Sequence, residues 1–334
     1  MNALQFHDAG NGVFHLVDWQ PNVEIFNLFG YSIRWYALGW IMSILVPYFI
    51  VRWLFKDQGI DPVLDKKGKW VETGKFDPLV FYCFFGMVVG ARLGHCIFYE
   101  PNYFLTSAQG WVEMFLPIKF DEFPSYWRFT GYMGLASHGG TIGLFLALLL
   151  YARIHQVQTW KLLDMIGIAA PFAASFIRFG NLMNSEIIGK VTYVPWAFIF
   201  HTQDALQNGQ LVPRHPAQLY EALAYIAIFI VGWWIFKKKA WHLAIKEKTI
   251  EKFGGNKDEK EKKETLGRFD VGSGFYFGFC IFCIFLFRFF VEFLKEVQGG
   301  VDDGSTTFDV GQMLSIPFVL AGLWCMLRPL KKSK

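Results

Sequence analysis

Four polar side chains crowd the end of one apolar segment. Arg178, Asn181, Asn184 and Glu186 follow one another within nine positions, directly after the small and apolar residues 166–177. Polar side chains at the end of a membrane-spanning helix are costly in lipid and usually mark a functional site. A buried arginine needs an anion, and its guanidinium binds phosphate or carboxylate well. These residues therefore predict a site for an anionic ligand.

The composition favours a membrane environment for this segment. Of the 334 residues, 53% are hydrophobic, only 18% are charged, and phenylalanine occurs 37 times. This composition excludes a soluble domain and predicts an all-α polytopic membrane protein with about seven helices that cross a hydrocarbon core of roughly 30 Å. The expected spans are residues 36–55, 78–99, 138–151, 162–177, 217–236, 271–294 and 311–327.

The positive charges predict the orientation of these spans. Loops rich in Lys and Arg face the cytoplasm, and 23 of the 32 Lys and Arg residues lie in the loops 52–77, 152–161 and 237–270 and in the C-terminal tail. We therefore expect the N-terminus on the extracytoplasmic side and the C-terminus in the cytoplasm.

This orientation divides the chain into functional parts. We expect an extracytoplasmic or interfacial segment at 1–35, a membrane domain at 36–327 and a basic cytoplasmic tail at 328–334. Within the membrane domain, 178–214 would form a small extracytoplasmic head, and 237–270 a charged cytoplasmic loop. A helix over 240–253 on an anionic lipid surface is one interpretation of this loop, and a solvated loop without chemistry is the favoured one.

Polar side chains from every predicted span lie at one level, near the outer leaflet. A random scatter of tolerated polar residues would not segregate in this way, so we expect them to form one site. The main members are Tyr36, Arg92, His95, His138, Arg178, Asn181, Glu186, Gln218, Glu221, Arg288, Glu292 and Gln312.

Several of these residues also have a purely structural interpretation. Arg288 and Glu292 lie four residues apart and could form an ion pair that holds helices together. His138 precedes two glycines at a helix start, where an imidazole could act as a base or merely cap the helix. Tyr36 could be an aromatic-belt residue.

The polar residues after the fourth predicted span and in the second one have structural alternatives as well. Arg178 and Asn181 could cap the end of a helix, and Glu186 could neutralise an arginine. Arg92 could pair with an acidic residue for structural reasons, and His95 is expected to be a packed histidine.

Three motifs resemble those of the bacterial phosphatidylglycerol–prolipoprotein diacylglyceryl transferases. They are R-x-G-N-x-x-N-x-E-x-x-G at 178–189, H-G-G-x-I-G at 138–143 and R-H-P-A-Q-L-Y-E at 214–221. The elements at 35–36, 90–94 and 311–315 also fall in the family's order. The resemblance spans roughly residues 30 to 327, which is nearly the whole chain.

The resemblance implies transfer of the diacylglyceryl group of phosphatidylglycerol to the lipobox cysteine of a prolipoprotein, with release of glycerol 1-phosphate. A free thiol with a pKa near 8.5 is mostly protonated at neutral pH, so a base would help. The implied catalytic residues are His138 as the base, Arg178 and Arg288 at the phosphate, and Tyr36. The implied substrate-binding residues are Asn181, Glu186, Glu292, Gly139, Arg92 and Gln218.

One position departs from the family's pattern. Where relatives often have arginine, this chain has Lys295, which keeps the charge but loses the bidentate fork. Its role is left open between ligand contact and snorkelling to the interface.

The expected partners are phosphatidylglycerol, prolipoproteins with a lipobox cysteine and the membrane lipids, in the bacterial inner membrane. No cofactor, metal or nucleic acid is expected, because no metal-ligand spacing is convincing and the five cysteines lie in apolar runs. Two alternatives lack transferase chemistry: an anionic-lipid-binding protein and a transporter. A transporter would need polar residues toward both faces, and the inner halves of the spans are nearly bare, apart from Asp164.

Overall fold

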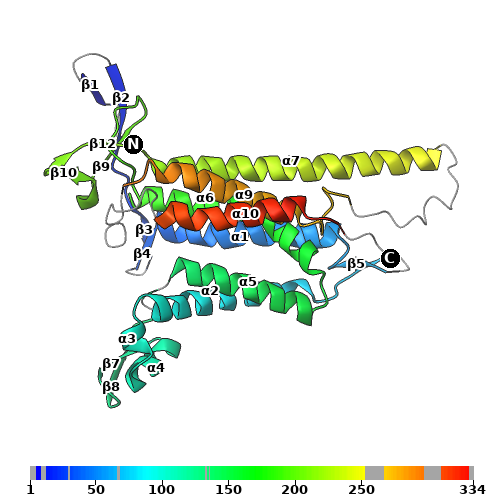
Figure 1. The fold of residues 1–334 in the computed structure, drawn as a ribbon, viewed down its shortest axis with the longest axis horizontal. Helices are drawn as coiled ribbons and strands as arrows, with labels where there is room; N and C mark the ends of the chain where they lie inside the picture. Colours follow the sequence, from blue (N-terminus) through cyan, green and yellow to red (C-terminus); the bar gives the residue numbers. More distant parts are fainter. Residues whose placement is uncertain are drawn as a thin grey trace. The chain divides into compact units, whose positions relative to one another are not determined.

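The computed structural model describes residues 5–8, 13–28, 31–65, 68–131, 134, 136–252, 267–296 and 310–330. They form a mostly helical structure with small sheets (Figure 1). The long helices are α1 (Trp35–Asp57), α2 (Phe76–Phe98), α5 (Ser137–Ile154), α6 (Thr159–Met183), α7 (Ala217–Lys252), α9 (Phe275–Glu292) and α10 (Val310–Leu327). Two short helices, α3 (Pro101–Phe104) and α4 (Ala108–Phe115), follow α2.

Five helical segments are long and apolar enough to cross a membrane. Within the described residues these are α1, α2, α6, the Ala217–Lys239 part of α7, and α9. Two shorter apolar helices, Gly139–Ile154 and Gly311–Leu327, lie within α5 and α10. By length and composition the chain is a multi-pass membrane protein, and each predicted span falls on a helix.

Two helices extend beyond the predicted spans. α6 continues to Met183, so Arg178 and Asn181 lie inside its last turns instead of after its end. Both side chains have polar partners in the structure, which permits the helix to continue through them. α7 continues to Lys252 as one helix, so the first part of the expected 237–270 loop is helical and no separate helix begins at residue 240. Residues 253–266 of that loop lie outside the described residues.

Small sheets are the other departure from an all-α structure. A four-stranded sheet has the order β1 (Gln5–Asp8), β2 (Val13–Trp19), β9 (Phe198–Phe200) and β12 (Pro213–Arg214). Four hairpins complete the set: β3 (Glu24–Leu28) with β4 (Tyr31–Arg34), β5 (Val63–Leu64) with β6 (Trp70–Val71), β7 (Ile118–Glu122) with β8 (Tyr126–Phe129), and β10 (Leu206–Gln207) with β11 (Gln210–Leu211). Residues 192–200 alternate in the sequence like a short strand, and of them Phe198–Phe200 form one, β9. All these strands lie outside the apolar helices.

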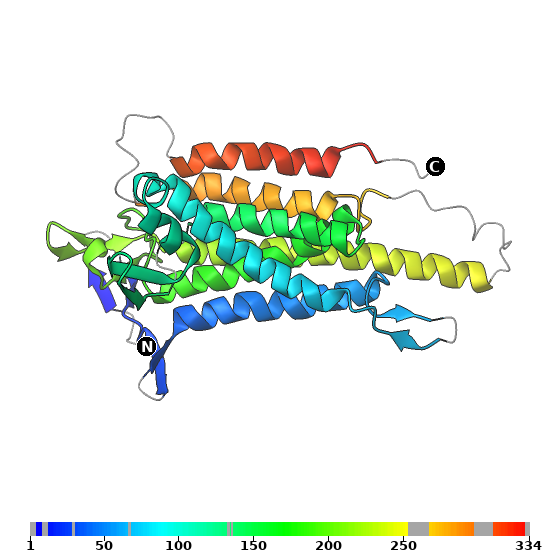
Figure 2. The same ribbon diagram turned by 90° about the horizontal axis from the view of Figure 1, so that it is seen from below.

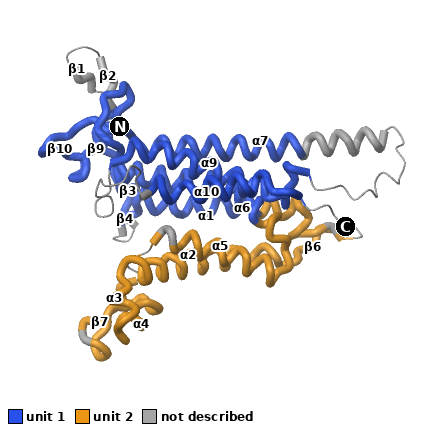
Figure 3. The backbone as a smooth tube through the Cα atoms, in the orientation of Figure 1, with its two compact units in different colours: residues 1–51, 163–334 blue, residues 52–162 orange. Residues whose placement is uncertain are grey.

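The chain divides into two compact units (Figure 3). Unit 1 consists of Met1–Val51 and Leu163–Lys334, and unit 2 of Arg52–Leu162. The apolar helices of unit 1 run side by side in both views, with α9 next to α10 and the strands β9 and β12 at one end of them (Figures 1 and 2).

A buried carboxylate fixes the start of α9 within unit 1. Asp164 of α6 accepts hydrogen bonds from the backbone N–H groups of Gly272, Gly274 and Phe277, at 2.8, 2.9 and 3.0 Å. The first N–H groups of a helix have no partner inside it, and negative charge is favoured there. The polar residue that stood apart from the others in the sequence is therefore a helix cap.

In unit 2, glycines allow α2 and α5 to pack in backbone contact. A Cβ on Gly90 would come within 2.4 Å of the carbonyl oxygen of Gly139, and one on Gly94 within 2.6 Å of the Gly139 Cα. Small residues at a helix interface permit such close approach in membranes. Gly139 is therefore needed for packing, whatever else it does.

Candidate active site

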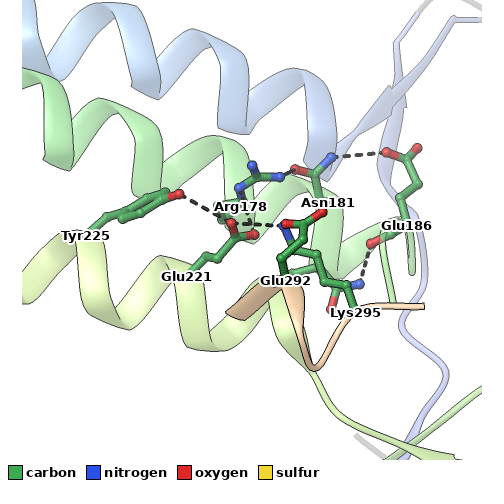
Figure 4. Close-up of polar contacts among 8 residues, drawn as sticks. Arg178, Asn181, Glu186, Glu221, Tyr225, Glu292 and Lys295 are labelled. Carbon is green, nitrogen blue, oxygen red and sulfur yellow. Dashed lines mark hydrogen bonds and ion pairs between the residues drawn. The ribbon is translucent and has the colours of Figure 1, made fainter. Parts of the chain in front are cut away.

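The centre of the polar cluster in unit 1 is Arg178, near the end of α6 (Figure 4). Its Nε lies 3.1 Å from Oε2 of Glu221, which comes from α7, and its Nη1 donates to Oδ1 of Asn181 at 3.4 Å. The side chain is 16% exposed. A nearly buried guanidinium is thus held from two sides, which fixes its orientation.

Glu221 is the residue on which the cluster converges. Its side chain is completely buried, and besides Arg178 it contacts two further groups. Oε1 accepts a hydrogen bond from the hydroxyl of Tyr225 at 3.3 Å and lies 3.2 Å from Nζ of Lys295 (Figure 4). A buried charge is tolerated only when it is paired and hydrogen-bonded. Here one carboxylate neutralises two cations from different segments.

Lys295 occupies the position where the chain departs from the family's pattern. Its side chain is buried, and Nζ lies 3.0 Å from Oε2 of Glu292 and 3.2 Å from Oε1 of Glu221. Of the two interpretations left open by the sequence, snorkelling is wrong, because Lys295 bridges two carboxylates inside the protein. A flexible ammonium with three donors suits such a bridge.

The ion pair between Arg288 and Glu292, considered as a structural alternative, is not found among the described residues. Glu292 binds Lys295 instead, because the chain turns back after α9 and brings Lys295 onto it. Arg288 is half-buried and has no hydrogen bond or ion pair to any described residue, although it lies within electrostatic range of Tyr225. A cation is thus left for another partner.

The loop after α6, residues 184–189 of the 178–189 motif, is called the signature loop. Hydrogen bonds between side chains of this motif hold the loop in place. Asn181 donates to Oε2 of Glu186 at 3.1 Å, and Asn184 donates to Oε1 at 2.9 Å. Gln218 of α7 donates to the backbone carbonyl of Glu186. Glu186 thus accepts from two side-chain amides. The structural alternative, in which it neutralises an arginine, is not found among the described residues. The spacing N-x-x-N-x-E is what allows both asparagines to reach one carboxylate.

Backbone pairing fixes the rest of this loop. Lys190 N–H donates to the carbonyl of Leu294 at 2.7 Å, and Glu296 N–H donates to that of Ile188 at 3.1 Å. A Cβ on Gly189 would come within 2.5 Å of the carbonyl oxygen of His215, so this glycine permits the close approach of two strands. The segment that carries Lys295 is therefore positioned by the signature loop.

The loop rests on the sheet of unit 1. Leu182 and Ile188 are buried in one apolar cluster with Phe198 and Phe200 of β9. The indole N–H of Trp19, on β2, donates to the carbonyl of Leu182 at 2.9 Å, which satisfies a carbonyl at the end of α6. The small sheet thus supports the end of the helix that carries Arg178.

Tyr36 lies at the start of α1, against the backbone of α6. A Cβ on Gly180 would come within 3.0 Å of its ring, and its ring meets that of Trp40 edge-on at 6.3 Å. Tyr36 is half-buried. Gly180, two residues after Arg178 in the sequence, therefore makes room for the ring of Tyr36.

Of the remaining predicted site residues, Gln312 lies in unit 1, where it is buried and donates to the carbonyl of Phe289 at 3.2 Å. The others belong to unit 2. Arg92 is buried, donates to the carbonyls of Glu113 at 2.6 Å and Met114 at 3.3 Å, and lies 4.9 Å from the centre of the Phe104 ring. This geometry favours its structural alternative, with backbone carbonyls in place of the expected acidic side chain.

The backbone of His138 lies in the first turn of α5, and its side chain is outside the described residues. The N-cap of α5 is Ala136, so His138 does not occupy the capping position considered for it. His95, expected to be a packed histidine, stacks on Tyr99 and lies 3.3 Å from Oε1 of Glu100.

The sequence motifs do not reveal the importance of three residues in this cluster. Glu221 is one of many polar residues in the predicted site, Tyr225 is not among them, and the role of Lys295 is left open. Gln218, Glu221 and Tyr225 do follow a helical spacing of three and four on α7, and that signal could have identified one face of the helix. No group of three or more described His, Cys, Asp and Glu side chains is placed to hold a metal ion.

Comparison with known proteins agrees with these motifs. The profile of the prolipoprotein diacylglyceryl transferase family matches residues 23–253 and 262–328. The chain belongs to this family. It is 46% identical to a phosphatidylglycerol–prolipoprotein diacylglyceryl transferase of Bacteroides fragilis, over 95% of this chain and 96% of that protein. Proteins of the same name from Porphyromonas gingivalis and Tolumonas auensis are 34% and 33% identical, each over 94% of this chain and over 95% and 98% of their own lengths.

Proposed function

We propose that this protein transfers the diacylglyceryl group of phosphatidylglycerol to the cysteine thiol of prolipoproteins and releases glycerol 1-phosphate. The observation that carries the proposal is the match to transferases of that name along 95% of the chain. The polar cluster of unit 1 supports it, because a phosphate-containing substrate needs cations that are fixed before it binds.

The cations of unit 1 have different tasks in this proposal. Arg178, oriented by Glu221 and Asn181, and Arg288, which has no described partner, bind the phosphate and stabilise the charge that develops as it leaves. Lys295 does not grip the phosphate, because two carboxylates hold it. It neutralises Glu221 and Glu292 and so keeps Arg178 from being fully compensated by them.

The reaction balances without a cofactor. The thiol proton passes to a base, for which we propose His138, and the thiolate attacks the carbon of the diacylglyceryl group that carries the phosphate oxygen. That C–O bond breaks, its electron pair stays on the phosphate oxygen, and a C–S bond forms. Tyr36 would donate a hydrogen bond to the lipid or to the leaving group. Asn181, Glu186 and Gln218 shape the binding loop, Glu292 holds Lys295, and Gly139 and Arg92 contribute through the packing of unit 2.

We further propose seven spans, with the shorter apolar helices of α5 and α10 counted among them. The N-terminus would be extracytoplasmic and the C-terminus cytoplasmic, in the bacterial inner membrane, because most of the Lys and Arg residues lie in alternate loops. The residues 1–35, the head at 178–214 and the cluster around Arg178 would then lie on the outer side. The loop 237–270 and the tail 328–334 would lie in the cytoplasm.

Purified protein, phosphatidylglycerol and a peptide with a lipobox cysteine test the function. We expect release of glycerol phosphate and a diacylglyceryl mass gain on the peptide, in equal amounts. A Cys→Ser peptide should give neither product. Binding of phosphatidylglycerol without either product, by protein that remains folded, would replace the transferase by a lipid-binding protein.

A further inference from the structure

A small module of unit 2 has its polar and apolar residues in unusual places. The module comprises α3, α4, β7 and β8, residues 101–129, and is labelled in Figure 1. It buries the carboxylate of Glu113 and exposes large aromatic side chains. A domain surrounded by water has the opposite arrangement.

The interior of the module is a hydrogen-bonded polar network around Glu113. This buried carboxylate accepts hydrogen bonds from the Phe120 N–H at 2.8 Å, the Tyr103 hydroxyl at 2.6 Å and the Gln109 amide at 2.8 Å. Burial together with the adjacent Glu113 raises the pKa of Tyr103 to about 12. Arg92 of α2 donates to the carbonyls of Glu113 and Met114 at the end of α4. The module is therefore held rigidly by its core.

The exterior carries a rim of large apolar side chains. We define the aromatic rim as Trp111, Phe115 and Leu116 of α4 and its C-cap, with Trp127 and Phe129 of β8. Phe129 is 74% exposed, Trp127 is 61% exposed, and the other three are about half exposed. Exposed apolar patches on a rigid surface mark contacts with a partner or a membrane.

The β7–β8 hairpin is amphipathic. Ile118 pairs with Phe129 and Phe120 with Trp127, so one face of the hairpin is apolar. Lys119 pairs with Arg128, so the other face is charged. Such a hairpin fits an interface between an apolar and an aqueous phase.

A groove opens between the apolar face of the hairpin and α4. It has a volume of about 510 Å³ and is lined by Val112, Leu116, Ile118, Phe120, Phe123, Pro124 and Trp127. The lining is entirely apolar. The groove therefore suits hydrocarbon.

The module continues a surface that already faces lipid. α2 is a candidate membrane span, and its exposed side chains include Phe84, Phe85 and, at its last residue, the 70% exposed Phe98. Only two residues separate Phe98 from the first residue of α3. The module thus begins where the hydrocarbon-facing surface of α2 ends.

We propose that the α3–β8 module docks on the lipid–water interface of the membrane, with the aromatic rim and the groove among the lipids and Lys119 and Arg128 at anionic headgroups. Tryptophan and other aromatic side chains favour this depth. Cations near an anionic lipid surface are attracted to it, and Arg128 shares its charge with Asp121, at 3.3 Å. This docking is independent of whether the protein is a transferase.

Spin labels on the two faces of one hairpin test the docking. Phe129→Cys places a label on the apolar face, and Asp121→Cys, also at an exposed position, places the matched control on the charged face. Leu211→Cys, on the β10–β11 hairpin of unit 1, is a second control. The full-length protein is placed in nanodiscs of phosphatidylcholine with phosphatidylglycerol, and the protein without an introduced cysteine gives the background signal.

We expect the Phe129 label to lose contact with a water-soluble nickel chelate and to gain contact with oxygen, which partitions into lipid. The Asp121 and Leu211 labels should stay accessible to nickel. Equal nickel accessibility at Phe129 and Asp121 overturns the docking. Protection that requires a second copy in the disc, seen as spin–spin broadening, or that appears only after a lipobox peptide is added, also overturns it in favour of those occupants.

Discussion

Units 1 and 2 both bury charged side chains, but they satisfy them in different ways. In unit 2, Arg92 of α2 donates to backbone carbonyls, and Glu113 of the α3–β8 module accepts from a backbone N–H and two neutral side chains. In unit 1, Arg178 and Lys295 are balanced against Glu221, so charge faces charge.

The difference separates a fold-stabilising use of charge from a site. A charge that is satisfied by the backbone is bound to the fold and has nothing to offer a ligand. Charges that are balanced against one another from three segments remain poised to interact with an additional anion. Arg288, which has no hydrogen bond or ion pair to any residue that the structure describes, supports this interpretation for unit 1.

The largest effect is expected from Glu221→Gln. The change keeps the shape but leaves Arg178 and Lys295 without the carboxylate they share, and breaking a buried pair costs about 3–5 kcal/mol. Thermal unfolding in detergent measures the loss, and the transfer assay should show almost no turnover. Glu100→Gln, at an exposed carboxylate, is the control. A normal unfolding temperature in the Glu221 variant would show that the shared carboxylate does not hold the cluster.

The contribution of Lys295 to stability and activity is expected to depend on the charge of its side chain and not on its shape. Lys295→Met removes the cation between Glu221 and Glu292 and should destabilise by about 2–3 kcal/mol, since Arg178 still compensates Glu221. Lys295→Arg keeps the positive charge and should keep most activity. Comparison of kcat and unfolding temperature for the two variants checks this. An inactive arginine variant that is folded would contradict it.

A steric change in unit 2 should have a comparable or smaller effect. Gly90→Ala places a Cβ within 2.4 Å of a backbone oxygen of α5, and overpacking of this kind costs about 1–3 kcal/mol. The unfolding temperature should fall. Gly131→Ala, where the added Cβ meets nothing within 4 Å but the φ of +69° is unfavourable, controls for backbone strain alone. An unchanged unfolding temperature in the Gly90→Ala variant would mean that α2 and α5 separate easily.

The smallest effect is a pH dependence in the module. Burial raises the pKa of Glu113, but the hydrogen bonds from Phe120, Tyr103 and Gln109 outweigh it and hold the pKa below its ordinary value of 4.5. Because the folded pKa is lowered, this carboxylate stabilises the protein above pH 4.5 and loses that contribution as the pH falls through the folded pKa. Glu113→Gln should flatten the acid side of the stability profile. An acid limb of the same slope in both proteins would place the sensitive group elsewhere.

Much of the architecture could be predicted from the sequence. The hydrocarbon thickness sets a minimum length for apolar segments, and each predicted span falls on a helix. The ends were less predictable, because Arg178 and Asn181 look like the end of a helix until their partners are known. The strands were harder still, since β9 and β12 have only three and two residues and are recognisable mainly by their pairing.

The site was predictable as a group of residues but not as a set of contacts. The motif at 178–189 identified Arg178, Asn181 and Glu186, because their spacing is local. The contact of Lys295 with Glu221 joins residues 74 positions apart, and only tertiary packing creates it. Arg92 illustrates the opposite case, since no sequence pattern reveals that an arginine will donate to the carbonyls of Glu113 and Met114.

The most direct test of the account compares Arg178→Lys with Arg92→Lys in the same transfer assay. Both changes keep a positive charge and remove the guanidinium fork. We predict that Arg178→Lys lowers kcat by about 100- to 1,000-fold in folded protein, as loss of a charge-stabilising group does. Arg92→Lys should lower the unfolding temperature and leave kcat nearly unchanged. A folded Arg92 variant with the larger loss of kcat, beside an Arg178 variant of normal kcat, would contradict the assignment of the site to unit 1.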